Sequence, residues 1–226
     1  MSDFLIEGRA LTKRFGRTAA LRGADAQIRP GEAVAVMGPS GSGKSTLLHC
    51  LAGILRPDQG EVWYDGRRVD TLSEARRTAL RRQAFGFVFQ FGQLVPELTV
   101  VENVALPLLL GGTPRAKAVA DARRWLDRLG VGKLAPSRPA ELSGGEGQRV
   151  AIARGLVHRP RAVFADEPTG ALDSLAGEAV MDLLMEQVAE LGTTVVLVTH
   201  DARVAAYAGR EIVIRDGRAV TPAVAA

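Results

Sequence analysis

A glycine-rich stretch set between two apolar segments constrains the fold of this chain more than any other feature. Residues 38–46 read GPSGSGKST and satisfy the pattern GxxxxGK[ST]. Residues 33–37 before it form a short apolar run, which predicts a buried strand. Residues 44–55 after it carry apolar side chains at helical spacing, which predicts a helix with one buried face. The order of strand, phosphate loop and helix predicts an α/β domain that binds a nucleoside triphosphate.

The loop has the residue types that a triphosphate requires. Its glycines let backbone N–H groups turn inward around the β- and γ-phosphates, and the following helix points its positive N-terminus at the same anion. Lys44 supplies a point charge, and the hydroxyl of Ser45 can bind Mg²⁺. A Gly- and Ser-rich turn is the simpler alternative, but it does not explain why Lys44 and Ser45 both stand in register. The residues expected to contact the nucleotide here are Gly38, Pro39, Ser40, Gly41, Ser42, Gly43, Lys44, Ser45 and Thr46.

Polar side chains follow two apolar, β-branched strands later in the chain. Residues 161–166 end in Asp166, where a carboxylate can reach Mg²⁺ directly or through water, and Glu167 comes next. Residues 193–199 are followed by His200. Two carboxylates at a strand end can be a surface pair, and a lone histidine there is more often structural. In this chain the phosphate loop is followed by the two carboxylates and then, after one more strand, by the histidine, and this order favours a catalytic site.

A third motif, LSGGEGQR at residues 142–149, is typical of the start of a helix. Ser143 suits the N-cap, and Glu146 three residues later completes a capping box. Gly144 and Gly145 allow close backbone approach, so the helix is expected to present an open N-terminus suited to an anion.

The remaining elements predict how the domain is organised. Residues 4–28 alternate loosely and are rich in turns, as expected for antiparallel strands. Further helices are expected at residues 71–83, 99–110, 114–129, 143–158 and 174–191, and further strands at 61–66, 85–89 and 211–217. Strands that alternate with helices, together with an antiparallel beginning and a helical middle, predict an α/β sheet domain with an inserted helical subdomain. Residues 221–226 are expected to form a frayed tail.

Composition argues against several classes of protein. With 5% aromatic residues, the chain lacks the basic stripe interleaved with aromatics that nucleic-acid binding needs, so no nucleic-acid partner is expected. The one dense basic patch, Arg76, Arg77, Arg81 and Arg82, suits an anionic membrane surface or a partner equally. The single cysteine, Cys50, excludes an internal disulfide and is expected in the core. No stretch reaches the roughly 18 apolar residues that span a bilayer, and no signal peptide is expected at the start of the chain.

The phosphate loop, the LSGGEGQR motif and the stretch VFADEP at residues 163–168 together resemble the ATP-binding cassette (ABC) ATPases. The resemblance runs from about residue 4 to about residue 220. It implies a P-loop NTPase fold with a mixed sheet core, an N-terminal antiparallel β part and an inserted helical subdomain. The whole of residues 1–226 is then one ABC ATPase domain. Residues 1–90 and 161–220 are expected to form its catalytic RecA-like and antiparallel β lobe, and residues 91–160 its helical signature subdomain.

The resemblance also implies roles for residues of the nucleotide site. Glu167 is expected to be the general base that polarises the attacking water, and His200 to contact the γ-phosphate and position that water. Gln90, which follows GFVF as in the family pattern, is expected to bind Mg²⁺ and water and to sense the membrane partner. Phe15 stands where the family usually has Tyr and is expected to stack on adenine. The expected Mg²⁺ ligands are Ser45, Gln90 and Asp166.

A second copy of the chain is expected to complete each site. In ABC ATPases the signature helix faces the γ-phosphate held by the other subunit, so residues 143–145 of one copy are expected to face Lys44 of the next, head to tail. Glu146 stands where the family commonly has Gln and places a negative charge near ATP. Asp173, within the stretch ALD, resembles the residue that crosses the dimer seam. All catalytic positions are intact, which favours a homodimer.

Residues 80–108 narrow the resemblance to one branch, through LRR, FGFVFQF, LVPELT, EN and LPL in that order. That branch holds the ATPases of lipoprotein-release, macrolide-efflux and antimicrobial-peptide-resistance systems and a cell-division relative. It implies ATP and Mg²⁺ as cofactors, hydrolysis to ADP and phosphate, and a separate membrane permease with few transmembrane helices. The chain is then a peripheral subunit at the cytoplasmic face of the inner or plasma membrane, in an export or mechanotransmission transporter. An ATP-switched regulator that drives an extracytoplasmic partner without transport stays open, because both use the same cassette.

Overall fold

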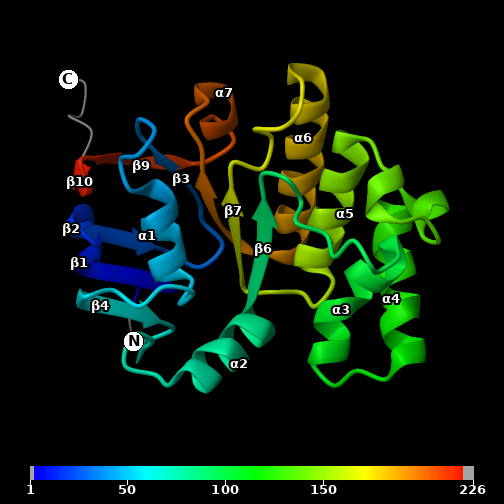
Figure 1. The fold of residues 1–226 in the computed structure, drawn as a ribbon, viewed down its shortest axis with the longest axis horizontal. Helices are drawn as coiled ribbons and strands as arrows, with labels where there is room; N and C mark the ends of the chain where they lie inside the picture. Colours follow the sequence, from blue (N-terminus) through cyan, green and yellow to red (C-terminus); the bar gives the residue numbers. More distant parts are fainter. Residues whose placement is uncertain (1–2, 221–226) are drawn as a thin grey trace. The chain divides into compact units, whose positions relative to one another are not determined.

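The computed structural model describes residues 3–220 and divides the chain into two compact units (Figure 1). The first unit takes the chain up to Arg81 and from Thr194 onward, and the second comprises Arg82–Thr193. The tail predicted for residues 221–226 lies outside the described residues.

Antiparallel strands open the first unit, as predicted. A four-stranded sheet has the order β2-β1-β4-β5, formed by β1 (Ile6–Phe15), β2 (Thr18–Ile28), β4 (Gln59–Tyr64) and β5 (Arg67–Arg68). The β1–β2 hairpin pairs Ile6 with Ile28 at one end and Phe15 with Thr18 at the turn. Phe15 therefore lies beside the turn, where half of its surface is exposed (50%).

A parallel arrangement of strands carries the phosphate loop. In the first unit, β3 (Ala33–Met37) pairs in parallel with β8 (Thr194–Val198) on one side and with β9 (Arg210–Arg215) on the other. A last strand, β10 (Arg218–Val220), pairs antiparallel with β9. Both β3 and β8 are apolar and largely buried, as is typical of parallel strands covered on both faces. The loop after β3 leads into α1 (Lys44–Leu51), and α7 (Ala202–Ala205) follows β8.

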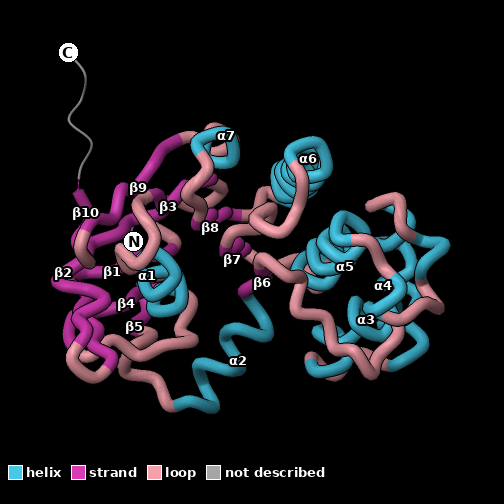
Figure 2. Tube along the Cα trace, turned by 45° about the horizontal axis from the view of Figure 1, so that its top comes forward, coloured by secondary structure: helices cyan, strands magenta, loops and turns pink. Residues whose placement is uncertain are grey.

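The second unit combines two parallel strands with a group of helices. The strands are β6 (Phe85–Phe89) and β7 (Ala162–Asp166), with Phe89 opposite Asp166. The helices are α3 (Val100–Leu110), α4 (Arg115–Arg128), α5 (Gly144–Leu156) and α6 (Ser174–Leu191), with short 3-10 turns at Gly132–Leu134 and Pro139–Glu141. The helices α3, α4 and α5 pack against one another, and α5 also packs on β6 (Figure 2).

Helix boundaries differ from the prediction where a turn residue intervenes. Helix α1 ends at Leu51 rather than at residue 55, because the chain turns at Gly53, whose φ is 65°. Helix α2 spans Glu74–Ala84 rather than residues 71–83, and the hydroxyl of Ser73 accepts from the amide of Arg76 at its start. Pro107 lies inside α3 without ending it.

Cys50 lies in the core, as predicted. Burial raises the pKa of its thiol to about 12, so the thiol stays protonated at neutral pH. In the part of the chain that the structure describes, no helix is long and apolar enough to cross a membrane.

Candidate functional site

The phosphate loop has a backbone that only glycine can adopt at its two ends. Gly38 and Gly43 have φ values of 148° and 108°. A Cβ added to Gly38 would collide with the carbonyl of Ile214, and one added to Gly43 would collide with the carbonyl of Ala20. The glycines that the motif requires are therefore required by the packing as well.

Lys44 is held inside this loop as a buried cation. Its side chain is only 8% exposed, and Nζ donates to the carbonyls of Gly38 and Pro39 at 2.8 and 3.0 Å. Within the described residues no carboxylate pairs with Lys44, and the buried Oγ of Ser42 has no hydrogen-bond partner. Gly43, as the N-cap of α1, offers no side chain to the first amides of the helix. A buried ammonium, an orphaned hydroxyl and an uncapped helix start fit a phosphate group.

His200 stands at the same edge of the first unit as this loop. It follows β8, and β8 pairs with β3 so that Val198 lies opposite Val36. The amide of Thr199 donates to the carbonyl of Val36 at 3.2 Å. Because both strands run in the same direction, their carboxyl ends place His200 and the phosphate loop at one edge.

The second unit brings Gln90 to the segment that holds the two predicted carboxylates. Gln90 follows β6, whose last residue lies opposite Asp166 at the end of β7. A Cβ added to Gly170 would lie 2.8 Å from Nε2 of Gln90, so the Gln90 side chain lies directly against this glycine. Glu167 has a φ of 48°, a left-handed conformation that strains a residue other than glycine. A conformation of this kind occurs in tight turns as well as at functional sites.

The capping box predicted for the signature motif is confirmed. Oε2 of Glu146 accepts from the amide and from the hydroxyl of Ser143 at 2.8 and 2.7 Å, and the amide of Glu146 donates back to Oγ at 3.4 Å. These hydrogen bonds from Ser143 lower the pKa of the Glu146 carboxyl, which therefore stays ionised. The negative charge then stands in the first turn of α5, where the helix dipole favours it.

The segment predicted to cross the dimer seam lies beside this motif. A Cβ added to Gly144 would come within 3.1 Å of the Leu172 side chain, and one added to Gly145 within 3.9 Å of the Ala176 Cβ. Asp173 caps α6 by accepting from the Ala176 amide at 2.9 Å. The second unit thus gathers the signature motif and the seam segment on one surface.

The sequence prediction missed two residues of α5 that hold the chain next to Gln90. Nε2 of Gln148 donates to the carbonyl of Phe89 at 3.0 Å. The guanidinium of Arg154 donates to the carbonyls of Gly92 and Gln93 at 2.6 and 2.7 Å. The available signal was weak: Gln148 is a buried polar residue on a helix whose other buried residues are apolar or glycine.

The predicted site residues divide between the two units. The first unit holds Phe15, residues 38–46 and His200, and the second holds Gln90, residues 143–146, Asp166, Glu167 and Asp173. Among the described residues, no three His, Cys, Asp or Glu side chains gather into a metal site. A Mg²⁺ ion that binds through one carboxylate, a hydroxyl and substrate phosphates needs no such group.

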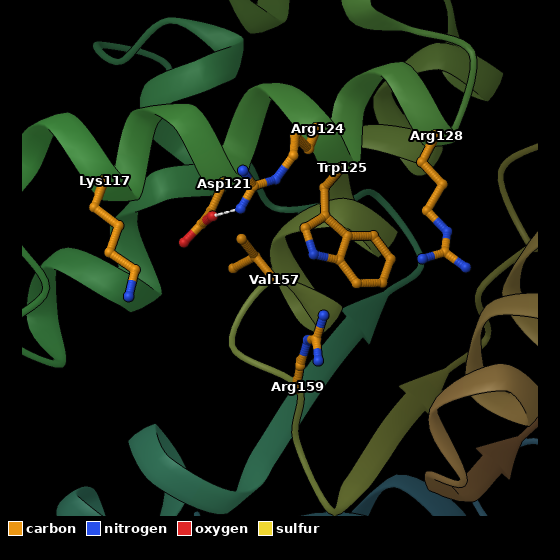
Figure 3. Close-up of a pocket in the computed structure, with 7 residues that line it drawn as sticks. All are labelled: Lys117, Asp121, Arg124, Trp125, Arg128, Val157 and Arg159. Carbon is orange, nitrogen blue, oxygen red and sulfur yellow. Dashed lines mark hydrogen bonds and ion pairs between the residues drawn. The ribbon is translucent and has the colours of Figure 1, made fainter.

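A cavity of about 380 Å³ in the second unit contains none of these residues (Figure 3). Its lining is Lys117, Asp121, Arg124, Trp125, Arg128, Val157 and Arg159. Arg124 is paired with Asp121, and Arg128 is paired with Glu190 and stacks on Trp125 at 5.3 Å. Two of its four cations are therefore already neutralised by neighbouring carboxylates.

Comparison with known proteins identifies the family. The family model described as ABC transporter matches residues 21–170. The lipoprotein-releasing system ATP-binding protein LolD of Shewanella sp. (strain MR-4) is 45% identical over 221 residues, 96% of each chain. LolD 2 of Caulobacter vibrioides is 45% identical, over 96% of this chain and 97% of its own. A solved dimeric ATP-binding cassette in a post-hydrolysis state, bound to ADP and Pi, matches with a TM-score of 0.88 and 40% identity, over 96% of this chain and 97% of its own. The chain therefore belongs to the ABC transporter family, as an ATP-binding cassette.

Proposed function

We propose that this chain is the ATPase subunit of a transporter of the lipoprotein-releasing type. The observation that carries this proposal is the buried Lys44, which has only carbonyl partners within a loop where a side chain at Gly38 or Gly43 would collide with backbone carbonyls. Similarity to LolD proteins over 96% of both chains supports the branch. As an ABC cassette the chain hydrolyses ATP to ADP and phosphate.

The residues of one copy divide the work at the nucleotide. The amides of residues 38–46 and the ammonium of Lys44 bind the β- and γ-phosphates, and Phe15 stacks on the adenine ring. Ser45, Gln90 and Asp166 would hold Mg²⁺, which would supply positive charge to neutralise the charge that develops on the phosphates.

Two further residues act on the attacking water. Glu167 accepts a proton from the attacking water. His200 contacts the γ-phosphate and positions the same water. Glu167 also has a left-handed backbone at φ 48°, a costly conformation of a kind that occurs at active sites. Glu167 and His200 therefore raise the rate of hydrolysis, whereas Lys44 provides affinity.

A second copy completes each site. The start of α5, with Ser143, Gly144 and Gly145, faces the γ-phosphate held by Lys44 of the other copy, and Asp173 lies at the seam between the copies. ATP binding therefore closes the head-to-tail dimer, and hydrolysis separates it.

The loop after β6 is the surface we assign to the membrane partner. Phe91 exposes 75% of its surface directly beside Gln90, although a side chain of this size is ordinarily buried. We assign residues 91–99 to contact with a separate permease that has few transmembrane helices. The chain then lies at the cytoplasmic face of the membrane as a peripheral subunit.

Phe91→Ser tests this assignment in the native cell. A tagged wild-type chain recovered from gently solubilised membranes is expected to bring with it, in stoichiometric amount, a permease with few transmembrane helices and a large extracytoplasmic domain. Phe91→Ser should lower this recovery at least about tenfold, because an interface anchor of this kind is worth more than about 1.4 kcal/mol.

Leu110→Ser is the matched control, since Leu110 is 61% exposed and lies at the end of α3. It should recover as much permease as the wild type. Recovery of a soluble partner with no membrane protein would contradict the transport assignment. If Phe91→Ser recovered as much permease as the wild type, the docking surface would lie elsewhere on the chain.

A further inference from the structure

The cavity that contains none of the predicted nucleotide residues lies along one side of α4 (Figure 3). The α4 residues that line it, from Lys117 to Arg128, recur at helical spacing and therefore share one side of the helix. The turn between α5 and β7 supplies the opposite wall through Val157 and Arg159. All of these residues belong to the second unit, so one compact part of the chain builds the whole cavity.

Positive charge exceeds negative charge around this cavity. Four cations and one carboxylate line it, and two of the cations, Arg124 and Arg128, are paired with carboxylates. The side chains of the other two, Lys117 and Arg159, have no ion-pair or hydrogen-bond partner among the described residues. Two positive charges at the cavity therefore lack a counter-charge within the described chain.

Trp125 adds a neutral donor to this wall. Its side chain is largely buried, and the guanidinium of Arg128 lies over the ring at 5.3 Å from the ring centre. The indole N–H has no hydrogen-bond partner among the described residues, yet its nitrogen is not among the buried atoms. Figure 3 shows this nitrogen turned toward Val157 and Arg159. The indole therefore presents an unused N–H group to the cavity.

The unpaired side chains at this cavity are all hydrogen-bond donors, namely those of Lys117, Trp125 and Arg159. An anion with several acceptor oxygens satisfies such a set. A phosphate group offers more acceptor oxygens than a carboxylate, and both lysine and arginine bind it well. The cavity volume of about 380 Å³ falls within the range of small-molecule sites, roughly 300–1,000 Å³, so the cavity has room for more than the phosphate group alone.

We propose that this cavity binds a phosphate-bearing anion, either a small phosphorylated molecule in solution or the headgroup of an anionic phospholipid. Lys117 and Arg159 supply the positive charge, and the indole N–H of Trp125 orients the phosphate. The simpler alternative is that water solvates two surface cations, and it predicts no specific contact with Trp125. No residue assigned to the nucleotide lines the cavity, so the inference does not depend on the proposed function.

The chain has two tryptophans, Trp63 and Trp125, which allow a titration with a readout at the cavity itself. Trp63 lies in the first unit, where its indole N–H donates to Glu61 at 2.9 Å. The N–H resonances of both indoles in the isotope-labelled full chain are followed by NMR while glycerol phosphate is added. MgADP is present at a saturating concentration throughout, so that the phosphate loop is already occupied. Trp63 is the internal control.

The Trp125 resonance is expected to shift and to reach saturation, whereas the Trp63 resonance stays in place and glycerol alone moves neither. Arg159→Asn and Lys117→Gln should each weaken this binding at least about tenfold, because each removes a charged donor to the phosphate. Asparagine tolerates the left-handed backbone at Arg159, whose φ is 53°. Arg123→Gln changes an exposed arginine of α4 that does not line the cavity, and it should bind as the wild type does.

A second measurement distinguishes the two sources of phosphate. Sedimentation of the full chain with vesicles of phosphatidylglycerol is compared with sedimentation with vesicles of phosphatidylcholine, whose headgroup has no net charge. If the ligand is a lipid headgroup, Arg159→Asn and Lys117→Gln should each lower binding to the anionic vesicles at least about fivefold, and Arg123→Gln should not. If the ligand is a free molecule, glycerol phosphate shifts the Trp125 resonance and vesicle binding is the same in all variants.

The inference is overturned if neither measurement shows binding that depends on Lys117 and Arg159. Equal shifts of the Trp63 and Trp125 resonances would also overturn it, because they indicate a general effect of ionic strength. Both substituted side chains are exposed, so the variants are expected to keep the thermal midpoint of the wild type. If the wild-type chain failed to hydrolyse ATP, the proposed function would fall, and these titrations would still decide whether the cavity binds phosphate.

Discussion

Glu167→Gln is expected to bind MgATP as the wild type does and to hydrolyse it about 100- to 10,000-fold more slowly. Glutamine has nearly the size and the backbone preferences of glutamate, so the substituted residue keeps the left-handed conformation at φ 48°. In the proposed mechanism the amide cannot take a proton from the attacking water, and the substitution removes one negative charge. Binding is therefore preserved while the chemical step is lost.

Glu167→Gln is also expected to accumulate an ATP-bound dimer, because hydrolysis separates the two copies in the proposed mechanism. Size-exclusion chromatography with light scattering, with and without MgATP, measures this dimer, and a phosphate-release assay measures the rate. Glu178→Gln is the matched control, since Glu178 is exposed on α6. Near-normal turnover by Glu167→Gln would remove Glu167 from the catalytic role.

Lys44→Ala is expected to weaken ATP binding by about a hundredfold. A hydrogen bond to a charged group contributes about 1.5–3 kcal/mol, and each 1.4 kcal/mol is a tenfold change in affinity. Lys44 is a buried cation in the loop with no carboxylate partner among the described residues, so no negatively charged side chain competes with the phosphates for it.

Titration with a fluorescent ATP analogue measures the affinity, and the thermal midpoint without nucleotide shows whether Lys44→Ala folds. Lys133→Ala, which removes an exposed lysine from the 3-10 turn at Gly132–Leu134, should bind the analogue as the wild type does. Unchanged affinity in Lys44→Ala would show that residues 38–46 do not hold the triphosphate.

Local features of the fold were predictable because neighbouring residues determine them. The strand at residues 33–37, the helix at residues 174–191 and the capping box of Ser143 and Glu146 occur as predicted. Each depends on apolar spacing or on a cap within one turn of chain. The end of α1 was placed too late because the turn at Gly53 was outweighed by the apolar pattern around it.

Features that depend on distant contacts were not predictable from one sequence. Arg154 meets Gly92 and Gln93 across about sixty residues of chain, and no local pattern indicates that contact. Likewise, the local sequence DEP does not predict the left-handed backbone of Glu167. The motifs predicted Gln90 as a site residue, and the packing of its side chain against Gly170 is visible only in the structure.

If two copies complete each other's sites head to tail, a mixture of two variants that are inactive alone should hydrolyse ATP. Lys44→Ala disables the phosphate loop. Gly145→Asp places a negative charge before the partner's γ-phosphate, in a position with room for a side chain, since the nearest atom to an added Cβ is 3.9 Å away. Each variant alone is expected to be inactive.

In a mixed dimer one site carries both defects and the other carries none. ATP hydrolysis by an equimolar mixture should therefore recover to about a quarter of the wild-type rate when subunits exchange at random. A mixture as inactive as its components would contradict the head-to-tail site, and so would Gly145→Asp alone turning over ATP at the wild-type rate.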